Sequence, residues 1–225
     1  MHKIDDLHQK LDYQFQDIAL LTMALTHRSF SADNNERIEF LGDSLLNMII
    51  AEVLYQRFPQ LREGDLSRIR ASLVSGETLA AIAVEFNLGQ FLRLGAGEKN
   101  TGGRHRDSTL ADVLEALIGA IYLEAGFDTC RQRVLAWFAS RLDALNPKVS
   151  HKDAKTRLQE LLQGRKQPVP GYEVVATTGA DHEQIFTVAC SVSVLKSVIT
   201  ATGSSRRKAE QAAAEKVLIA LKDFE

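Results

Sequence analysis

The stretch of residues 36–58 constrains the fold of this chain more than any other. Apolar side chains recur along it at positions 38, 41, 45, 48, 49 and 53, the spacing of one face of an α-helix. On such a helix Glu36, Glu39 and Asp43 fall within an arc of roughly 60°. Like charges at these spacings repel each other, so the helix carries three neighbouring carboxylates against its own stability.

These carboxylates have two interpretations. Asp33 and Glu36 are spaced like a capping box, and acidic residues in a first helical turn complement the helix dipole. Glu39 and Asp43 lie further along the helix, where the dipole no longer favours them. Because clustered carboxylates suit hard divalent cations such as Mg²⁺, Glu39 and Asp43 are candidate metal ligands.

A second stretch, residues 109–123, is apolar on nearly all sides, which predicts a buried helix. Its only charged residues are Asp112 and Glu115. Asp112 also fits a capping box with Thr109. Glu115 lies among apolar neighbours, where an unpaired carboxylate is costly and normally pairs, takes up a proton or binds a metal. The small residues at 116, 119 and 120 would let this helix lie close to a neighbour.

The two helices together predict one site. Packed face to face, they would form a cage of four carboxylates, namely Glu39, Asp43, Asp112 and Glu115. Mutual repulsion would make the cage unstable without one or two Mg²⁺ ions. A di-iron carboxylate bundle is excluded, because it needs a histidine three residues after a glutamate and neither Glu39 nor Glu115 has one.

Composition and charge set the broad class. The 225 residues, 45% hydrophobic and 25% charged, fit one large or two modest globular domains. The net charge of −2 divides into −4 for residues 1–150 and +2 for residues 151–225. No apolar run is long enough to span a membrane and the N-terminus lacks the core of a signal peptide, so we expect a cytoplasmic protein without a membrane partner. Cys130 and Cys190 form no CxxC pair and fit a reducing compartment.

Residues 1–145 are predicted to form an all-α domain. Helical periodicity covers residues 18–25, 38–58, 66–74, 79–86, 110–123 and 134–145. The longest interruption, residues 95–107, is rich in glycine and is expected to be a flexible loop. Its Arg104, His105 and Arg106 are candidate phosphate contacts.

A second domain is predicted for residues 153–225, after a linker at residues 146–152. It is expected to be α+β, in the order α-β-β-β-α. The helices are expected at residues 154–162 and 206–224, and the strands at residues 172–178, 184–192 and 197–202. The strands would form an antiparallel sheet with both helices on one face.

The start of the last helix carries three cations, Arg206, Arg207 and Lys208, where the helix dipole disfavours them. Cations and free backbone N–H groups at a helix start form a phosphate clamp, which is the interpretation we favour. The alternative is a solvated charged end, softened by pairing of Glu210 with Arg206 or Arg207.

The chain resembles bacterial ribonuclease III. The likeness rests on residues 36–46, on the Leu-Thr-His-Arg-Ser run at residues 25–29 and on the helix of Asp112 and Glu115. Residues 156–221 resemble a double-stranded-RNA-binding domain. The resemblance implies a helical endonuclease domain that cleaves double-stranded RNA with Mg²⁺, for which Mn²⁺ substitutes, and without an organic cofactor. It implies products with 5′-phosphate and 3′-hydroxyl ends, from precursors of ribosomal, messenger, transfer and other structured RNAs.

Residue roles follow from the same resemblance. Mg²⁺ would be held by Glu39, Asp43, Asp112 and Glu115, with Asp43 and Glu115 the most critical for catalysis. Glu36 and Glu63 match accessory acidic positions. The family works as a homodimer in which each site cuts one strand. Phe40 is a candidate dimer contact, with a place in the core as its alternative.

The resemblance also implies three groups of RNA contacts. The first helix of the second domain would meet a minor groove, the loop between its first two strands a second minor groove, and the start of its last helix the intervening phosphates. The residues are Thr156, Gln159 and Glu160; His182; and Ser204, Ser205, Arg206, Arg207 and Lys208.

Three alternatives remain at this point. The first is a non-catalytic regulator that binds double-stranded RNA through a degenerate nuclease fold. The second is a metal-dependent nuclease that acts on DNA. The third, a ribonuclease with histidine acid–base catalysis, would use His27 and His105, but nothing in the sequence pairs them and such an enzyme does not need the carboxylates.

Overall fold

A computed structural model describes residues 2–145, 154–179, 184–195 and 197–222. The chain divides into two compact units, Met1–Ser150 and His151–Glu225. The predicted linker at residues 146–152 lies outside the described residues. Each unit is described by itself below.

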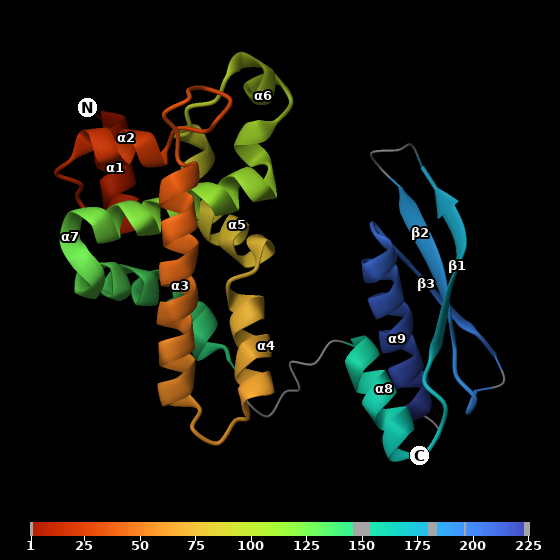
Figure 1. Ribbon diagram of the computed structural model, residues 1–225. Helices are drawn as coiled ribbons and strands as arrows, with labels where there is room; N and C mark the ends of the chain where they lie inside the picture. Colours follow the sequence, from red (N-terminus) through yellow and green to blue (C-terminus); the bar gives the residue numbers. More distant parts are fainter. Residues whose placement is uncertain (1, 146–153, 180–183, 196, 223–225) are drawn as a thin grey trace. The chain divides into compact units, whose positions relative to one another are not determined.

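The first unit is built from helices alone within its described residues, as predicted (Figure 1). Its elements in chain order are α1 (His2–Leu11), α2 (Ile18–Ala24), α3 (Glu36–Arg57), α4 (Glu63–Leu73), α5 (Gly76–Glu85), the 3₁₀ turn η1 (Leu88–Gln90), α6 (Ala96–Asn100), the 3₁₀ turn η2 (Gly103–His105) and α7 (Asp107–Asp143). The two longest helices, α3 and α7, cross in the middle of the unit and make its most extensive contact. The apolar faces of both helices lie in one core, which the other helices surround.

Two glycines set how closely α3 and α7 approach. A Cβ atom added at Gly42 of α3 would lie 1.8 Å from the carbonyl oxygen of Glu115, and one added at Gly119 of α7 would lie 2.4 Å from that of Ile38. Real Cβ atoms essentially never come so near, so any side chain at either position would push the helices apart. The backbone around Glu39 is therefore held directly against the backbone around Glu115.

Both predicted capping boxes are wrong. The N–H of Glu36 is bound by the side-chain oxygen of Asn34, at 3.0 Å, so Asp33 does not cap α3. Helix α7 begins at Asp107, which places Thr109 inside its first turn and not at its cap. Asp112 is consequently one turn further into the helix than a capping box requires.

The sequence also underestimates the helical content. The predicted loop at residues 95–107 contains α6 and η2, and α1 lies in a segment with no predicted helix. The two helices predicted at residues 110–123 and 134–145 correspond to the two helical parts of α7, which a kink at Gly126 separates. The φ of 78° at Gly126 is non-helical and suits glycine. None of the helices among the described residues is long and apolar enough to cross a membrane.

The second unit has the predicted order α-β-β-β-α. Helix α8 (Ala154–Gly164) precedes strands β1 (Gly171–Thr178), β2 (Ile185–Ser191) and β3 (Ile199–Gly203), and α9 (Arg206–Lys222) follows them. The strands pair antiparallel in the order β1-β2-β3, with Val174 opposite Val188 and Val188 opposite Ala201. Both helices lie on one face of the sheet (Figure 1), where buried residues such as Leu158 and Val217 form a separate core.

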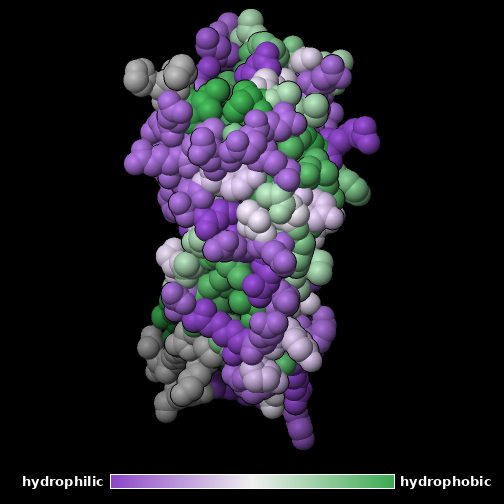
Figure 2. Space-filling model, turned by 90° about the vertical axis from the view of Figure 1, so that its left-hand side faces the viewer, coloured by the Kyte–Doolittle hydropathy of each residue, from purple (hydrophilic) through white to green (hydrophobic). Residues whose placement is uncertain are grey.

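Helix α3 also carries large apolar side chains that face solvent. Phe40 is 76% exposed, and Met48 and Tyr55 are 58% and 73% exposed. Within this chain a core position for Phe40 is therefore wrong. On the face drawn in Figure 2, apolar areas likewise interrupt a mostly hydrophilic surface.

Candidate functional site

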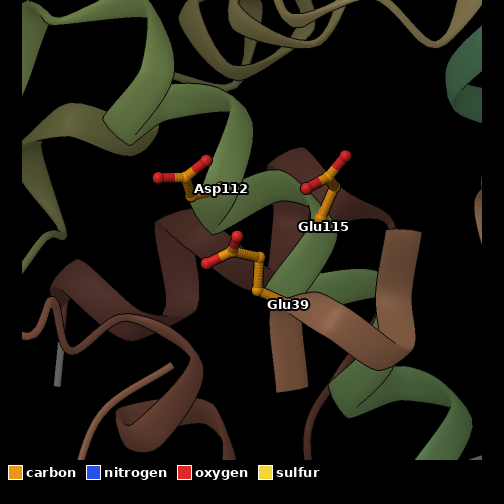
Figure 3. Close-up of side chains that lie close together, drawn as sticks. All are labelled: Glu39, Asp112 and Glu115. Atoms are coloured by element: carbon orange, nitrogen blue, oxygen red, sulfur yellow. The ribbon is translucent and has the colours of Figure 1, made fainter. Parts of the chain in front are cut away.

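The crossing of α3 and α7 brings three carboxylates together. One oxygen atom from each of Glu39, Asp112 and Glu115 lies within 4.8 Å of the others. Figure 3 shows Glu39 on α3 between Asp112 and Glu115, which project from successive turns of α7. All three side chains are half-buried. The close approach at Gly42 and Gly119 is the reason that acids from two helices reach one point.

The fourth predicted carboxylate, that of Asp43, does not belong to this group. It lies one turn after Glu39 and is exposed, and its Oδ1 accepts a hydrogen bond of 2.8 Å from the side-chain amide of Asn47. Its charge still acts on Glu115, because it contributes to the raised pKa of that residue. Asp43 therefore lies at the edge of the cluster.

The pKa values show how strongly these acids affect each other. Burial, followed by the charges of Asp43, Glu39 and Asp112, raises the pKa of Glu115 from its ordinary 4.5 to about 8. Burial, followed by the charges of Asp112 and Glu36, raises the pKa of Glu39 to about 7. The pKa of Asp112 is also raised by burial, although the positive groups of His27 and Arg28 oppose the shift. At neutral pH without a cation, Glu115 therefore retains its proton, because burial and the neighbouring carboxylates disfavour its charged form.

A cleft of about 500 Å³ adjoins the cluster. Its lining combines acids with positively charged and hydroxyl side chains, and consists of His27, Arg28, Ser29, Asn35, Glu36, Glu39, Glu98, Arg106, Ser108, Thr109 and Asp112. Both arginines of the lining pair with its acids, Arg28 with Glu36 at 3.4 Å and Arg106 with Glu98. The cleft therefore offers cations and carboxylates side by side, which suits a ligand that carries negative charge and also meets a cation.

The segment that carries His27 and Arg28 is fixed to the chain around Gly95. The hydroxyl of Ser29 accepts the N–H of Gly95 at 3.0 Å, and a Cβ at Gly95 would lie 2.2 Å from the carbonyl oxygen of Ser29. The same hydroxyl lies 2.8 Å from Nδ1 of His27. No catalytic role is predicted for His27 from the sequence, yet it lines the cleft. The neighbouring Arg and Ser in the run at residues 25–29 were the available signal.

The two accessory acids lie in different places. Glu36 lines the cleft and pairs with Arg28, whose Nη1 lies 3.4 Å from its Oε1. Glu63 begins α4, accepts a hydrogen bond of 2.7 Å from the hydroxyl of Ser67, and lines a separate groove between α3 and α4. The structure therefore brings Glu36, but not Glu63, to the carboxylate cluster.

The cluster fits a hard divalent cation. Within the described part of the chain, Glu39, Asp112 and Glu115 form no ion pair, and their side-chain oxygens accept no hydrogen bond. Three convergent oxygen ligands without a neutralising partner are what Mg²⁺ and Mn²⁺ prefer. A bound cation would also remove the repulsion that raises the pKa values.

In the second unit, the predicted phosphate-binding residues surround the start of α9. Arg206, Arg207 and Lys208 are exposed, and the hydroxyl of Ser205 caps the helix by accepting the N–H of Lys208 at 3.2 Å. A Cβ at Gly203 would lie 2.4 Å from the backbone nitrogen of Ala209, so the turn into α9 requires glycine there.

The other predicted contacts lie on α8 or outside the described residues. Gln159 and Glu160 are exposed on α8 and Thr156 is partly exposed one turn earlier. His182 lies outside the described residues. Glu210 is predicted to pair on its own helix only, whereas in the structure it is a buried carboxylate that joins two helices.

Both units match known protein families. A family described as Ribonuclease-III-like matches residues 17–142, and the double-stranded RNA binding motif matches residues 154–221.

Relatives match over almost the whole chain. A protein from Hahella chejuensis named Ribonuclease 3 is 57% identical over 97% of this chain and 97% of its own length. A Ribonuclease 3 from Vibrio parahaemolyticus is 55% identical over 96% of each chain.

Solved structures match the first unit. The nuclease domain of a ribonuclease III from Campylobacter jejuni is 44% identical, with a TM-score of 0.62, and the match covers 65% of this chain and 100% of that domain. A second structure of this nuclease domain, described as flexible in a region involved in dimer formation, is 45% identical with a TM-score of 0.61, over 62% of this chain and 99% of that one.

Proposed function

The chain belongs to the ribonuclease III family and is an endoribonuclease for double-stranded RNA, and we propose that it cuts each strand with Mg²⁺ held by Glu39, Asp43, Asp112 and Glu115. The observation that carries this proposal is the meeting of three carboxylates from α3 and α7, where burial and then mutual repulsion raise the pKa values of Glu39 and Glu115. Asp43 joins this set because its charge acts on Glu115 from one turn beyond Glu39. Mn²⁺ substitutes for Mg²⁺, since both accept carboxylate oxygens.

When bound, Mg²⁺ would supply Lewis acidity that favours attack of water at neutral pH and stabilises charge on the phosphoryl oxygens. The chain itself contributes the four carboxylates that bind the cation. Arg28 and Arg106, with His27 beside them on the cleft, orient a phosphodiester next to these carboxylates. Water adds to phosphorus and the 3′-oxygen leaves, so the products carry 5′-phosphate and 3′-hydroxyl ends. Neither a nucleophilic side chain nor an organic cofactor takes part.

The second unit provides the grip on the RNA duplex. Exposed Gln159 and Glu160, with Thr156, face a minor groove from α8, while Ser204, Ser205 and the cations 206–208 of α9 bind the intervening phosphates. His182 meets a second minor groove. Such domains bind A-form shape and 2′-hydroxyl groups over roughly 16 base pairs, which selects RNA duplexes over DNA duplexes.

The active enzyme is a homodimer. Exposed Phe40, Met48 and Tyr55 form an apolar strip on α3, and an apolar groove of about 560 Å³ lies beside Tyr55 between α3 and α4. An isologous contact would cover the same strip on both copies. Two sites, one from each copy, then match the two strands of a duplex. We place the enzyme in the cytoplasm, where it processes ribosomal, messenger, transfer and other structured precursor RNAs.

Cleavage of a long RNA duplex tests the proposal. The wild-type chain and the variants E115Q and E52Q would be compared with Mg²⁺ and with EDTA. Glu52 is a matched control, because it also lies on α3 but pairs with Arg131 away from the cleft. We expect E52Q to cleave like the wild type, and E115Q to lose at least about a hundredfold in rate, as expected when electrostatic stabilisation is removed from a reaction centre.

RNA binding in EDTA separates the alternatives. A chain that binds the duplex under all conditions but never cleaves it would be a non-catalytic regulator. Equal cleavage of a DNA duplex would indicate a nuclease without RNA preference. Full cleavage by E115Q would overturn the assignment of the carboxylates.

A further inference from the structure

Glu210 is an unusual residue in the second unit, because it is a carboxylate buried to 8% exposure next to a surface of cations. It lies on α9, one turn after Arg206. Its Oε1 accepts a hydrogen bond of 2.9 Å from Nε of Arg206, and its Oε2 accepts one of 2.5 Å from Nζ of Lys155 on α8. These two partners, with Lys155 first, lower the pKa of Glu210, so it stays charged at neutral pH.

The contact with Arg206 has a specific geometry. Glu210 binds Nε, so the two terminal nitrogens of the guanidinium group are not used by this ion pair. The Arg206 side chain remains 66% exposed. A guanidinium held at its inner nitrogen keeps its outer face for a planar contact with a phosphate, and less side-chain entropy is lost when that contact forms.

The contact with Lys155 joins α9 to α8, the other helix that is proposed to contact RNA. Lys155 lies in the first turn of α8, and its ammonium group also lies 4.5 Å from the centre of the Tyr172 ring on β1. Its backbone N–H is bound at 3.2 Å by the side chain of Gln211, the residue after Glu210. Two neighbouring residues of α9, Glu210 and Gln211, thus hold the first turn of α8. Thr156 lies in this turn and Gln159 follows in the next one.

We propose that Glu210 is a positioning residue for RNA binding, which orients Arg206 toward a backbone phosphate and fixes the start of α8 relative to the start of α9. The inference rests on the proposed function, in which these two helix starts contact the RNA. The RNA contacts from the start of α8 and from the start of α9 then lie at a fixed distance from each other. Because an A-form duplex has a regular repeat, helices that are already held at this distance lose less conformational entropy when they bind it.

The proposal predicts an effect opposite in sign to that of simple charge. Glu210 is negative and lies close to cations that would face phosphates, so removing its charge should strengthen binding if only net charge counted. If Glu210 acts by orientation, the isosteric variant E210Q should weaken binding despite the added positive charge. The sign of the change therefore separates the two explanations.

The experiment measures binding of the full-length chain to an RNA duplex of about 20 base pairs, longer than the roughly 16 that one such domain spans, in EDTA to prevent cleavage. We expect E210Q to weaken binding about fivefold, comparable to the loss of one charge-assisted hydrogen bond. The slope of log K against log salt should fall by about 1, because one phosphate contact is lost. The double variant E210Q/R206A should bind more weakly than R206A, because the start of α8 is no longer fixed, but the additional loss should be smaller than the loss that E210Q causes alone.

The matched control is E215Q. Glu215 of α9 pairs with Arg157 of α8, so it also joins the two helices, but it lies further along α9 and its side chain is 47% exposed. We expect E215Q to bind like the wild type. Hydrogen exchange of residues 154–222 in the full chain establishes that E210Q is folded. If E210Q loses protection across the sheet, R206K takes its place, since lysine keeps the charge but cannot bind Glu210 and a phosphate with one planar group.

Each result has a defined meaning. Binding by folded E210Q that equals or exceeds that of the wild type overturns the positioning role, as does unchanged binding by R206K. A loss for E215Q as large as that for E210Q also overturns it, because any link between the helices would then suffice. The variants R207A and K208A test the surface itself. If neither weakens binding, the proposed phosphate contacts are wrong. If both do while E210Q and R206K do not, only the role of Glu210 fails.

Discussion

Replacing Glu115 by glutamine should stabilise the protein in the absence of metal. In the folded chain, burial and the charges of Asp43, Glu39 and Asp112 raise the pKa of Glu115 from 4.5 to about 8. A difference of this size corresponds to about 5 kcal/mol of destabilisation of the charged form. Because Glu115 is only half-buried and solvent screens part of the repulsion, we expect a gain of about 2 kcal/mol for E115Q at pH 8.5 in EDTA.

The sign of the pH dependence follows from proton binding. Below about pH 4.5 the carboxyl group is protonated in both the folded and the unfolded chain, so it makes no difference to stability. Between pH 4.5 and about 8 the folded chain retains the proton that the unfolded chain has lost. The free energy of unfolding of the metal-free wild type should therefore fall as the pH rises through this range, and the advantage of E115Q should grow with it.

Urea unfolding followed by tryptophan fluorescence measures the stability of the first structural unit, which contains Glu115. The chain has one tryptophan, Trp137, which is buried in the first unit and donates a hydrogen bond of 3.0 Å to the carbonyl oxygen of Leu11. Its signal reports unfolding of the unit that holds the carboxylates. Protein concentration must be constant, because dimerisation would add to the apparent stability.

Two further measurements complete this test. Mg²⁺ should stabilise the wild type at pH 8.5 and should stabilise E115Q less, since the variant has lost a ligand. E52Q should show neither the gain in EDTA nor the weaker response to Mg²⁺. If E115Q is as stable as the wild type or less stable at pH 8.5 in EDTA, burial and the neighbouring carboxylates do not destabilise the charged form of Glu115. The prediction is then wrong.

Three further predictions concern the same unit. The variant G42A should destabilise the first unit by about 3 kcal/mol in urea unfolding, because a Cβ at this position would meet the Glu115 carbonyl. The control G76A should be nearly neutral, since a Cβ there would have nothing within 4 Å. Equal effects of the two variants would contradict the role of close helix packing. The variant F40A should shift sedimentation toward the monomer at low micromolar concentration without lowering the stability of the monomer, and an unchanged dimer would remove Phe40 from the interface. Mn²⁺ affinity, measured by electron paramagnetic resonance, should fall at least about tenfold from pH 8 to pH 6. The reason is that Glu39 and Glu115 must lose their protons to bind a cation. An Mn²⁺ affinity that does not change with pH would contradict the raised pKa values.

Helical periodicity was sufficient to predict the fold of both units. The spacing of apolar residues in α3 and α7 identified both central helices, and the change of pattern after residue 153 identified the three strands. It also predicted two separate helices within residues 107–143, and the structure has them on either side of a kink at Gly126, where φ is positive. The short helix α6 was missed because its five residues have no apolar period and lie in a segment rich in glycine.

The acids were predictable as a set, but their exact arrangement was not. Glu115 was identified because an unpaired carboxylate in an apolar helix is costly. Glu39 was identified because it was expected beyond the reach of the helix dipole, but the structure places it in the first turn of α3, so that argument was wrong. The importance of Gly42 was not visible, since it depends on which residue of the other helix it meets. The exposed position of Asp43 and the second partner of Glu210 also depend on side-chain geometry that no spacing rule gives.

Crystals soaked in Mn²⁺ show directly whether Glu39, Asp112 and Glu115 bind a divalent cation, because the anomalous signal of manganese identifies its position. We predict a peak between the side chains of Glu39, Asp112 and Glu115, with metal–oxygen distances of about 2.2 Å, and its loss in E115Q. A peak bound elsewhere on the chain, with these three carboxylates left without a cation at saturating Mn²⁺, would contradict it.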